Sequence, residues 1–247
     1  MNANAVSAAS REISHLHSMV MDEPPPAPEG VEVGTQSLSI RAAGSTSQRD
    51  AASLLINKRY AWRGYQCNGV PDHQTADCVT LIASEHEAAV ATMTIGFDGP
   101  QGILADDLFA DITDKARNEG REICEFTKLA IESDTKSMQV LASMVHVSMI
   151  LARRLRGADE LFIEVNPRHV RYYQRMLGFK VVGPERLNLR VNAPAVLLSL
   201  DLAWSLEQIA KFGGKGDLAV GEKTLYPYFY SVEEENRIFH CLKHQVQ

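Results

Sequence analysis

The pattern of apolar and polar positions predicts alternating strands and helices from Leu38 onward. Leu38 and Ile40 alternate with polar residues, as in a half-buried strand, and residues 47–65 carry apolar residues at helical spacing. Two apolar runs then flank the polar stretch 84–87, which is typical of a β-hairpin. The chain therefore begins with a predicted strand, helix and hairpin. The helix face is expected to contain Ala51, Leu54, Leu55 and Tyr60.

The second half of the pattern continues this alternation with longer elements. Residues 104–118 carry apolar residues at helical spacing among many acids, which predicts an exposed helix. A strand pattern at 121–132, a long helical pattern at 137–156 and a buried strand at 161–165 follow. This order predicts a crossover between parallel or locally divergent strands. The remaining predicted elements are a helix at 168–177, a strand near 181–182, a strand at 195–202 and a helix after Asp201.

Composition along the chain predicts three parts. Residues 1–36 are rich in Ala, Ser, Pro and acids, and the proline-rich run 24–28 excludes a continued helix, so a flexible leader is expected. Residues 37–203 contain the alternating pattern and form the expected core. Residues 204–247 start as a helix, pass the glycine-rich break 213–216 and end in an aromatic tail, which predicts a C-terminal helical extension.

Overall composition narrows the class of protein. Hydrophobic residues make up 45% of the chain, enough for a folded globular core. The formal net charge of −6 provides no general basic field, so no nucleic-acid partner is expected. The four cysteines lie far apart with no C-x-x-C pair, which argues against a structural metal site or a disulfide framework. The first residues lack the apolar run of a signal peptide or a transmembrane segment, which indicates a cytoplasmic protein.

The segment 160–179, ELFIEVNPRHVRYYQRMLGF, contains a well-marked corner. Asn166 is a natural N-cap, and Pro167 occupies the first helical position, where its missing N–H is not needed. Gly178 supplies the left-handed turn that ends the helix and returns the chain into the next strand. Local geometry explains this strand, helix, strand corner without any catalytic role.

The order of the elements resembles the GNAT acyltransferases. GREICEFTKLAIE at 120–132, together with EVNPRHVRYYQRMLGF at 164–179, is similar to the FeeM-type N-acyl amino acid synthases, relatives of the acyl-homoserine lactone synthases. The resemblance covers residues 38–202. It implies an α/β fold with a mixed central sheet flanked by helices. It also implies that the fourth and fifth strands splay apart and expose backbone groups to the pantetheine arm of an acyl thioester. The implied activity joins a fatty acyl chain to an amino acid.

The turn before the long helix indicates which donor is used. Acetyl-CoA enzymes resemble one another in a glycine-rich turn there, which binds pyrophosphate. Here the turn is SDTKSMQ, without glycine, and Asp134 would repel a pyrophosphate. An acyl carrier protein presents pantetheine without that group. The resemblance therefore implies an acyl carrier protein and an amino acid acceptor as partners, with no bound cofactor and the phosphopantetheine arm as part of the donor substrate.

Aminolysis of a thioester needs a neutral amine, so a carboxylate with a raised pKa is the expected general base. Glu125 is the first candidate. Regular alternation would place it on one face with Ile123, Leu129 and Ile131, where apolar neighbours disfavour its charged form. The alternative is a structural salt bridge to Arg121 or Lys128.

Other candidates surround this pair of strands. Glu164 lies near the end of the adjacent strand, on the face opposite Leu161, and is the second candidate for the base. The resemblance implies that Asn166 hydrogen-bonds the pantetheine arm, although capping alone explains it. Tyr173 lies one residue further from Gly178 than the family's tyrosine, which leaves its role as an acid open. If the strand splays, the thioester arm would meet the backbone of Thr127, Lys128, Leu129 and Ala130, and a bulge is expected there.

Cations are needed for the acceptor's carboxylate and for an acidic carrier protein. The arginines near the predicted site are Arg59, Arg121, Arg168 and Arg171. A basic patch for the carrier is an alternative use of Lys58 and Arg59 together with Arg153, Arg154 and Arg156.

Some residues have simpler roles. His146 is expected to be a satisfied core histidine, and Cys124 has no evident base partner for an acyl-cysteine route. The methionines of the long helix and the aromatic tail would shape an acyl tunnel or simply fill the core. Two rival functions are an acyl-CoA-dependent N-acetyltransferase, and a non-catalytic GNAT-like module that binds an acyl carrier or regulates lipid metabolism. The second predicts that Glu125 and Glu164 both form structural ion pairs and that no cleft separates their strands.

Overall fold

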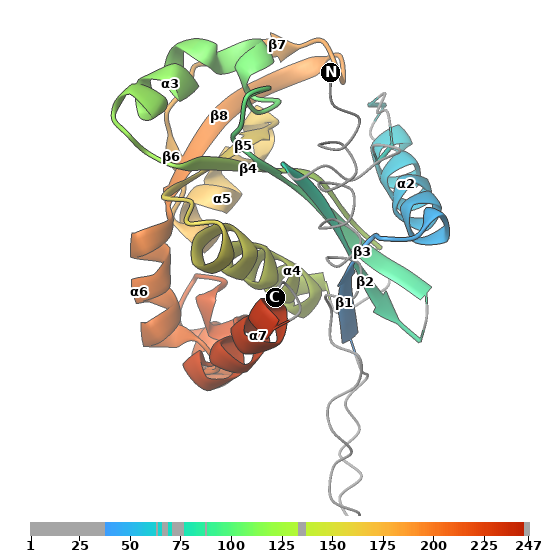
Figure 1. Cartoon of the computed structure of the whole chain (residues 1–247), viewed down its shortest axis with the longest axis vertical. Coiled ribbons are helices and arrows are strands. Elements are labelled where there is room, and N and C mark those ends of the chain that lie inside the picture. Colours follow the sequence, from blue (N-terminus) through green and yellow to red (C-terminus); the bar gives the residue numbers. More distant parts are fainter. Residues whose placement is uncertain are drawn as a thin grey trace, which may run out of the picture.

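The computed structural model describes residues 38–62, 64–65, 69–70, 77–86, 88–132 and 137–244. The predicted leader at 1–36 and the turn residue Asp134 lie outside these residues. The described chain forms one curved sheet with helices on both faces (Figure 1). Within the described part, no helix is both long enough and apolar enough to cross a membrane.

The sheet has the order β1-β2-β3-β4-β5-β8-β6, and β7 pairs with β8. Every neighbouring pair is antiparallel except β4 and β5, which are parallel and joined by the α4 crossover that the sequence predicts. The strands are β1 (Leu38–Ala42), β2 (Cys78–Glu85), β3 (Ala88–Phe97), β4 (Ile123–Ile131), β5 (Glu160–Val165), β6 (Lys180–Val181), β7 (Arg186–Asn188) and β8 (Ala193–Asp201).

Helices α2 (Thr46–Ala61) and α3 (Asp106–Asn118) cover one face of the sheet, and α4 (Ser137–Met149) crosses the other (Figure 1). Ser45 and Gln48 form a capping box that starts α2. The predicted inner face of this helix is partly wrong, because Leu54 is 71% exposed. Leu55 is buried as expected, but its buried companions are Ala52 and Ile56.

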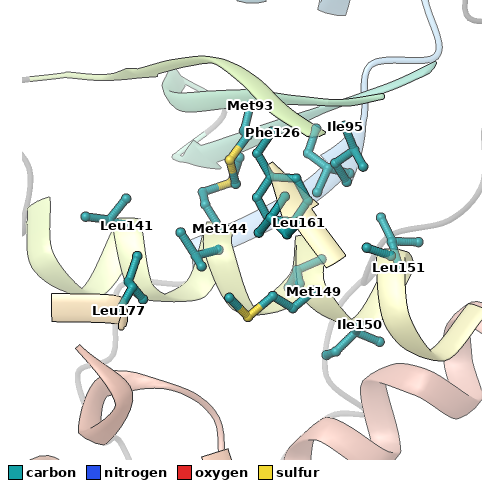
Figure 2. Packing of buried hydrophobic residues seen from close by; sticks show 14 of the residues in the cluster. Met93, Ile95, Phe126, Leu141, Met144, Met149, Ile150, Leu151, Leu161 and Leu177 are labelled. Atoms are coloured by element: carbon teal, nitrogen blue, oxygen red, sulfur yellow. The ribbon is translucent and has the colours of Figure 1, made fainter. Parts of the chain in front are cut away.

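The main core lies between the sheet and α4 (Figure 2). Met93 and Phe126 from the sheet pack with Met144 and Met149, which are 0% and 2% exposed. Met144 and Met149 therefore fill ordinary core, whereas Met138, at the start of α4, is 37% exposed. The long predicted helix also changes its winding, because residues 150–155 form a π-helical segment after α4.

The chain after the corner packs onto this core. Helix α5 (Val170–Leu177) follows the corner and precedes β6. Helices α6 (Leu202–Phe212) and α7 (Val232–His244) lie beside α4 (Figure 1). Tyr226 and Phe229, from the aromatic tail between them, are buried in the main core.

His146 fastens this extension to α4. Its Nδ1 accepts a hydrogen bond from the Tyr230 amide at 3.1 Å, and its Nε2 lies 3.3 Å from Glu235 Oε2. Its ring stacks on Phe229 with centroids 4.9 Å apart. The prediction of a satisfied core histidine is confirmed.

Gly178 joins the corner to the extension, and its replacement tests that contact. Its φ is 81°, and an added Cβ would lie 2.2 Å from Trp204 Cη2. Gly157 is a matched control, since its φ is 76° and an added Cβ would meet nothing within 4 Å. Gly157→Ala should cost about 1–2 kcal/mol in the free energy of unfolding from the left-handed backbone. Gly178→Ala should cost roughly 1 kcal/mol more, because the indole must move. Equal losses in chemical denaturation would contradict a close contact with Trp204.

Candidate active site

The parallel strands β4 and β5 pair over three residues only and then diverge. The paired residues run from Ile123↔Glu160 to Glu125↔Phe162. Beyond them β4 stays paired with β3, and β5 stays paired with β8. We call the end where these two strands separate the open end, and the opposite end the closed end. The splay implied by the family resemblance is therefore present.

A β-bulge lies in β4 at the start of the open end. Thr94 pairs with Thr127 and Thr92 with Ala130, so β4 carries one extra residue between these pairs. Lys128 has a φ of 53° within this bulge. The bulge was expected, but it reverses the strand's alternation.

This reversal corrects one prediction. Glu125 does not share a face with Leu129 and Ile131, which pack against the main core on the α4 side. Ile123 does share the face of Glu125, as predicted, and it lies in the small core under α3.

Glu125 is buried, with 3% of its surface exposed. Its two oxygens accept hydrogen bonds from the amides of Leu104 and Ala105 at 2.8 and 3.0 Å. Gly96 on β3 leaves room for the side chain, since a Cβ there would lie 2.9 Å from Glu125 Oε1. Burial raises the pKa of Glu125 to about 7, although the two amides act in the opposite direction.

The predicted alternative for Glu125, a salt bridge, is not observed among the described residues. Arg121 pairs with Glu160 and Asp201 instead, and Lys128 donates to the carbonyl of Gly69 at 2.7 Å. A carboxylate offers about four lone-pair sites, and the two amides occupy two of them. Glu125 therefore retains the capacity to accept a hydrogen bond or a proton from a substrate.

Glu164 lies on β5 on the same face of the sheet as Glu125. It forms an ion pair with Arg190 and accepts a hydrogen bond from Asn188 Nδ2. Burial raises the pKa of Glu164, and the charge of Arg190 opposes that rise. The charge of Glu164 in turn contributes to the raised pKa of Glu125, so the structure brings the two predicted carboxylates together.

Arg190 links the surroundings of both carboxylates and was not predicted from the sequence. Its Nη1 donates to the Leu104 carbonyl and to Asp107, each at 2.6 Å, while its Nη2 contacts Glu164. Leu104 is the residue whose amide binds Glu125. The short strand β7 precedes Arg190, but the sequence of β7 shows no clear alternation of apolar and polar residues. The sequence therefore did not predict that this arginine lies near the two carboxylates.

The corner after β5 is built as predicted. Asn166 accepts a hydrogen bond from the Arg168 amide at 3.3 Å and donates to the Pro194 carbonyl at 3.4 Å. Its capping role is confirmed, whereas pantetheine binding stays a prediction. Tyr173 packs against the main core, edge-on to Phe179 with centroids 5.9 Å apart.

Arg168 reaches across the open end. Its Nη2 donates to the Tyr65 hydroxyl at 2.8 Å, which joins the corner to the chain after α2. No described acidic residue pairs with Arg168. Arg59, near the end of α2, lies over the Trp62 ring at 5.8 Å.

Two predictions about cations need correction. Arg121 lies at the closed end of β4, where its ion pairs with Glu160 and Asp201 are 2.9 and 3.2 Å long, so it is not placed to bind an acceptor. The single basic patch is also wrong. Lys58 pairs with Glu132 at the open end, whereas Arg153 pairs with Asp159 at the closed end, about 30 Å away along a nine-residue strand.

Cys124 lacks the surroundings of a nucleophilic cysteine. Cys124 is completely buried, and burial strongly raises the pKa of its thiol, which disfavours the nucleophilic thiolate. Within the described ranges, no three His, Cys, Asp or Glu side chains gather as a possible metal site.

The mixed sheet, the diverging parallel pair and the corner after β5 define a GNAT acyltransferase fold. The chain belongs to the N-acyl amino acid synthase FeeM family, whose sequence profile matches residues 51–201. It is therefore an acyltransferase.

Comparison with solved structures agrees with this fold. FeeM, an N-acyl amino acid synthase from uncultured soil microbes, matches with a TM-score of 0.61 at 23% identity, over 69% of this chain and 93% of that chain. An aminoglycoside N(6')-acetyltransferase from Legionella pneumophila matches with a TM-score of 0.47 at 13% identity, over 72% of this chain and 98% of that chain. No curated protein sequence matches the chain.

Proposed function

We propose that the protein transfers a medium or long fatty acyl group from the phosphopantetheine thioester of an acyl carrier protein to the α-amine of an amino acid. The family to which the chain belongs supports amino acid acylation. The observation that carries the proposal is the divergence of β4 from β5, with Glu125 and Glu164 on one face beside it. A non-catalytic module would not need the two strands to diverge. It would also not need a buried carboxylate such as Glu125, which forms no ion pair with any described residue.

In the proposed mechanism Glu125 acts as the general base. The amine nitrogen bonds to the thioester carbonyl carbon and its proton passes to the Glu125 carboxylate. The C–S bond breaks, and the departing pantetheine thiolate takes up the proton from Glu125, which regenerates the carboxylate. A pKa of about 7 suits this role, because such a group is both partly ionised and basic near neutral pH. Glu164 is held by Arg190 and contributes charge beside the base.

Charge at the open end supports a carrier-protein donor. Arg168, Arg171 and Arg175 follow one another at three- and four-residue intervals on the corner and α5, and all three are exposed. None of them pairs with an acidic residue in the part of the chain that the structure describes. A row of unneutralised cations beside the splay suits the acidic surface of a carrier protein.

Charge reversal tests this donor. Arg171→Glu with Arg175→Glu should raise the KM for an acylated carrier protein by roughly tenfold, because the row steers and holds an acidic partner. The KM for the same acyl group on free pantetheine should not change. Lys115→Glu on α3, 77% exposed in its side chain, is the matched control. Equal effects on both donors, or an equal effect of the control, would contradict carrier docking at this row.

The reaction itself can be tested directly. The protein is incubated with acylated carrier protein and a mixture of proteinogenic amino acids, and N-acyl products are sought by mass spectrometry. An N-acyl amino acid is the expected product. Consumption of acetyl-CoA in a parallel reaction, with the carrier donor intact, would instead identify an acetyltransferase. Absence of product from every donor would overturn the proposal.

A further inference from the structure

A row of threonines crosses the sheet on the face that carries Glu125. Thr80 on β2 lies beside Thr94 on β3, and Thr94 lies beside Thr127 on β4. Thr80 and Thr94 are 1% and 3% exposed, and their hydroxyl oxygens are 2.9 Å apart. These two hydroxyls therefore satisfy each other, as buried polar groups normally do.

Thr127 ends the row and differs from its neighbours. Its hydroxyl oxygen is inaccessible to solvent and has no hydrogen-bond partner among the described residues. It lies at the bulge of β4, where β5 is no longer paired with this strand. A buried hydroxyl without a partner is unfavourable in a folded protein unless a ligand or water completes it. Its place at the open end indicates a substrate.

The surroundings indicate which atom of the substrate Thr127 contacts. Glu125 lies two residues before Thr127 on β4, on the same face of the sheet. On the neighbouring strand β5, Phe162 pairs with Glu125, and Glu164 lies two residues further along, level with Thr127. Two neighbouring carboxylates repel the negative oxygen that develops on a thioester carbonyl in the transition state, so that oxygen is not expected beside Thr127. The same carboxylates attract a group that carries N–H donors. We infer that the Thr127 hydroxyl accepts a hydrogen bond from the acceptor's α-amine and holds it between Glu125 and Glu164. This inference rests on the proposed function.

The hydroxyl does not change its protonation in the reaction. The amine nitrogen bonds to the carbonyl carbon, the amine's proton moves to Glu125, and the C–S bond breaks. The sulfur leaves on the pantetheine arm as a thiolate and takes up the proton from Glu125. Thr127 orients the nitrogen lone pair toward the carbonyl carbon by holding one N–H. It therefore acts on the acceptor and leaves binding of the donor unchanged.

Three variants separate this role from a structural one. Thr127→Val keeps the shape but removes the hydroxyl, and Thr127→Ser restores it. Thr80→Val removes a hydroxyl from the same row but leaves Thr94 without its partner. We expect Thr127→Val to lower kcat/KM for the amino acid by about 10- to 100-fold with an unchanged KM for the donor. Thr127→Ser should stay within about threefold of the wild-type protein.

Stability provides the contrasting readout. Thr127→Val removes an unpaired hydroxyl and should leave the melting temperature unchanged or raised, whereas Thr80→Val should lower it with little change in acceptor KM. An unchanged kcat/KM in Thr127→Val overturns the inference. Equal losses of stability and activity in Thr127→Val and Thr80→Val also overturn it, because they would show a purely structural row.

Binding separates this inference from the proposed function. Each proteinogenic L-amino acid is titrated calorimetrically into the wild-type protein in the presence of a non-transferable S-alkyl pantetheine thioether. The best binder is compared with its α-hydroxy acid analogue, which lacks the amine. A preference for the amine that is lost in Thr127→Val supports the subsite, even if no product forms and the proposed function fails. Product formation without such a preference overturns the subsite alone.

Discussion

Replacement of Glu125 by Gln is expected to lower kcat by about 10²- to 10⁴-fold, the usual contribution of a positioned general base. Gln cannot accept the amine's proton. In the wild-type protein kcat should rise with pH through about 7, since the base works only when deprotonated and burial raises the pKa of Glu125 to about that value. The variant should lack this rise. Steady-state kinetics between pH 5 and 9 measure both effects.

Glu125 also holds the amides of Leu104 and Ala105, so the fold of the variant must be checked. The NH₂ end of the Gln side chain would face one of these backbone N–H donors and leave it without an acceptor. This costs about 1–3 kcal/mol of stability. Melting temperatures identify this contribution. Glu122→Gln, at an exposed position beside β4, is the matched control and should retain full activity. Full turnover in Glu125→Gln, with Glu164→Gln inactive, would assign the base to Glu164.

Arg190→Met is expected to destabilise the protein by about 2–3 kcal/mol. Removing one partner of a buried ion pair leaves the other charge unpaired, and Glu164 has only 10% of its side chain exposed. The expected loss of stability is smaller than for a fully buried ion pair, because the Arg190 side chain is 33% exposed. The free energy of unfolding, measured by chemical denaturation, tests this value.

The matched control for Arg190 is Arg153→Met. Arg153 is 29% exposed and pairs with Asp159, which is 41% exposed, so its loss should cost less than about 1 kcal/mol. Equal costs for the two variants would contradict a buried role for the Arg190 pair.

The cost of Arg190→Met should also depend on pH. The charge of Arg190 lowers the pKa of Glu164, so its removal raises that pKa further in the folded state. Stability that comes from this pair is present where Glu164 is ionised and is lost as the pH falls and Glu164 becomes protonated. The difference between variant and wild type should therefore shrink on acidification from pH 8 to pH 5. A difference that is constant with pH would show that Arg190 acts by packing alone.

Local patterns in the sequence determined the elements and their order. The Asn166 cap, Pro167 and the left-handed Gly178 depend on backbone geometry within a few residues, so the corner after β5 was predictable. The apolar periodicity likewise placed α3, the two central strands and the crossover helix. The family resemblance added the splay of β4 from β5, and the bulge of β4 was expected as its consequence; the structure contains both.

Only the tertiary structure decided how the candidate site is built. The bulge at Lys128 depends on the register between β3 and β4, and it moves Leu129 to the face opposite Glu125. Arg190 reaches Glu164 from 26 residues away in the chain, and no local pattern encodes such a contact. The Thr127 hydroxyl, which has no hydrogen-bond partner among the described residues, is equally a property of packed strands, because a partner is present or missing only once the sheet has formed. The sequence thus determined which elements form, and the long-range pairing of those elements decided which side chains meet at the open end.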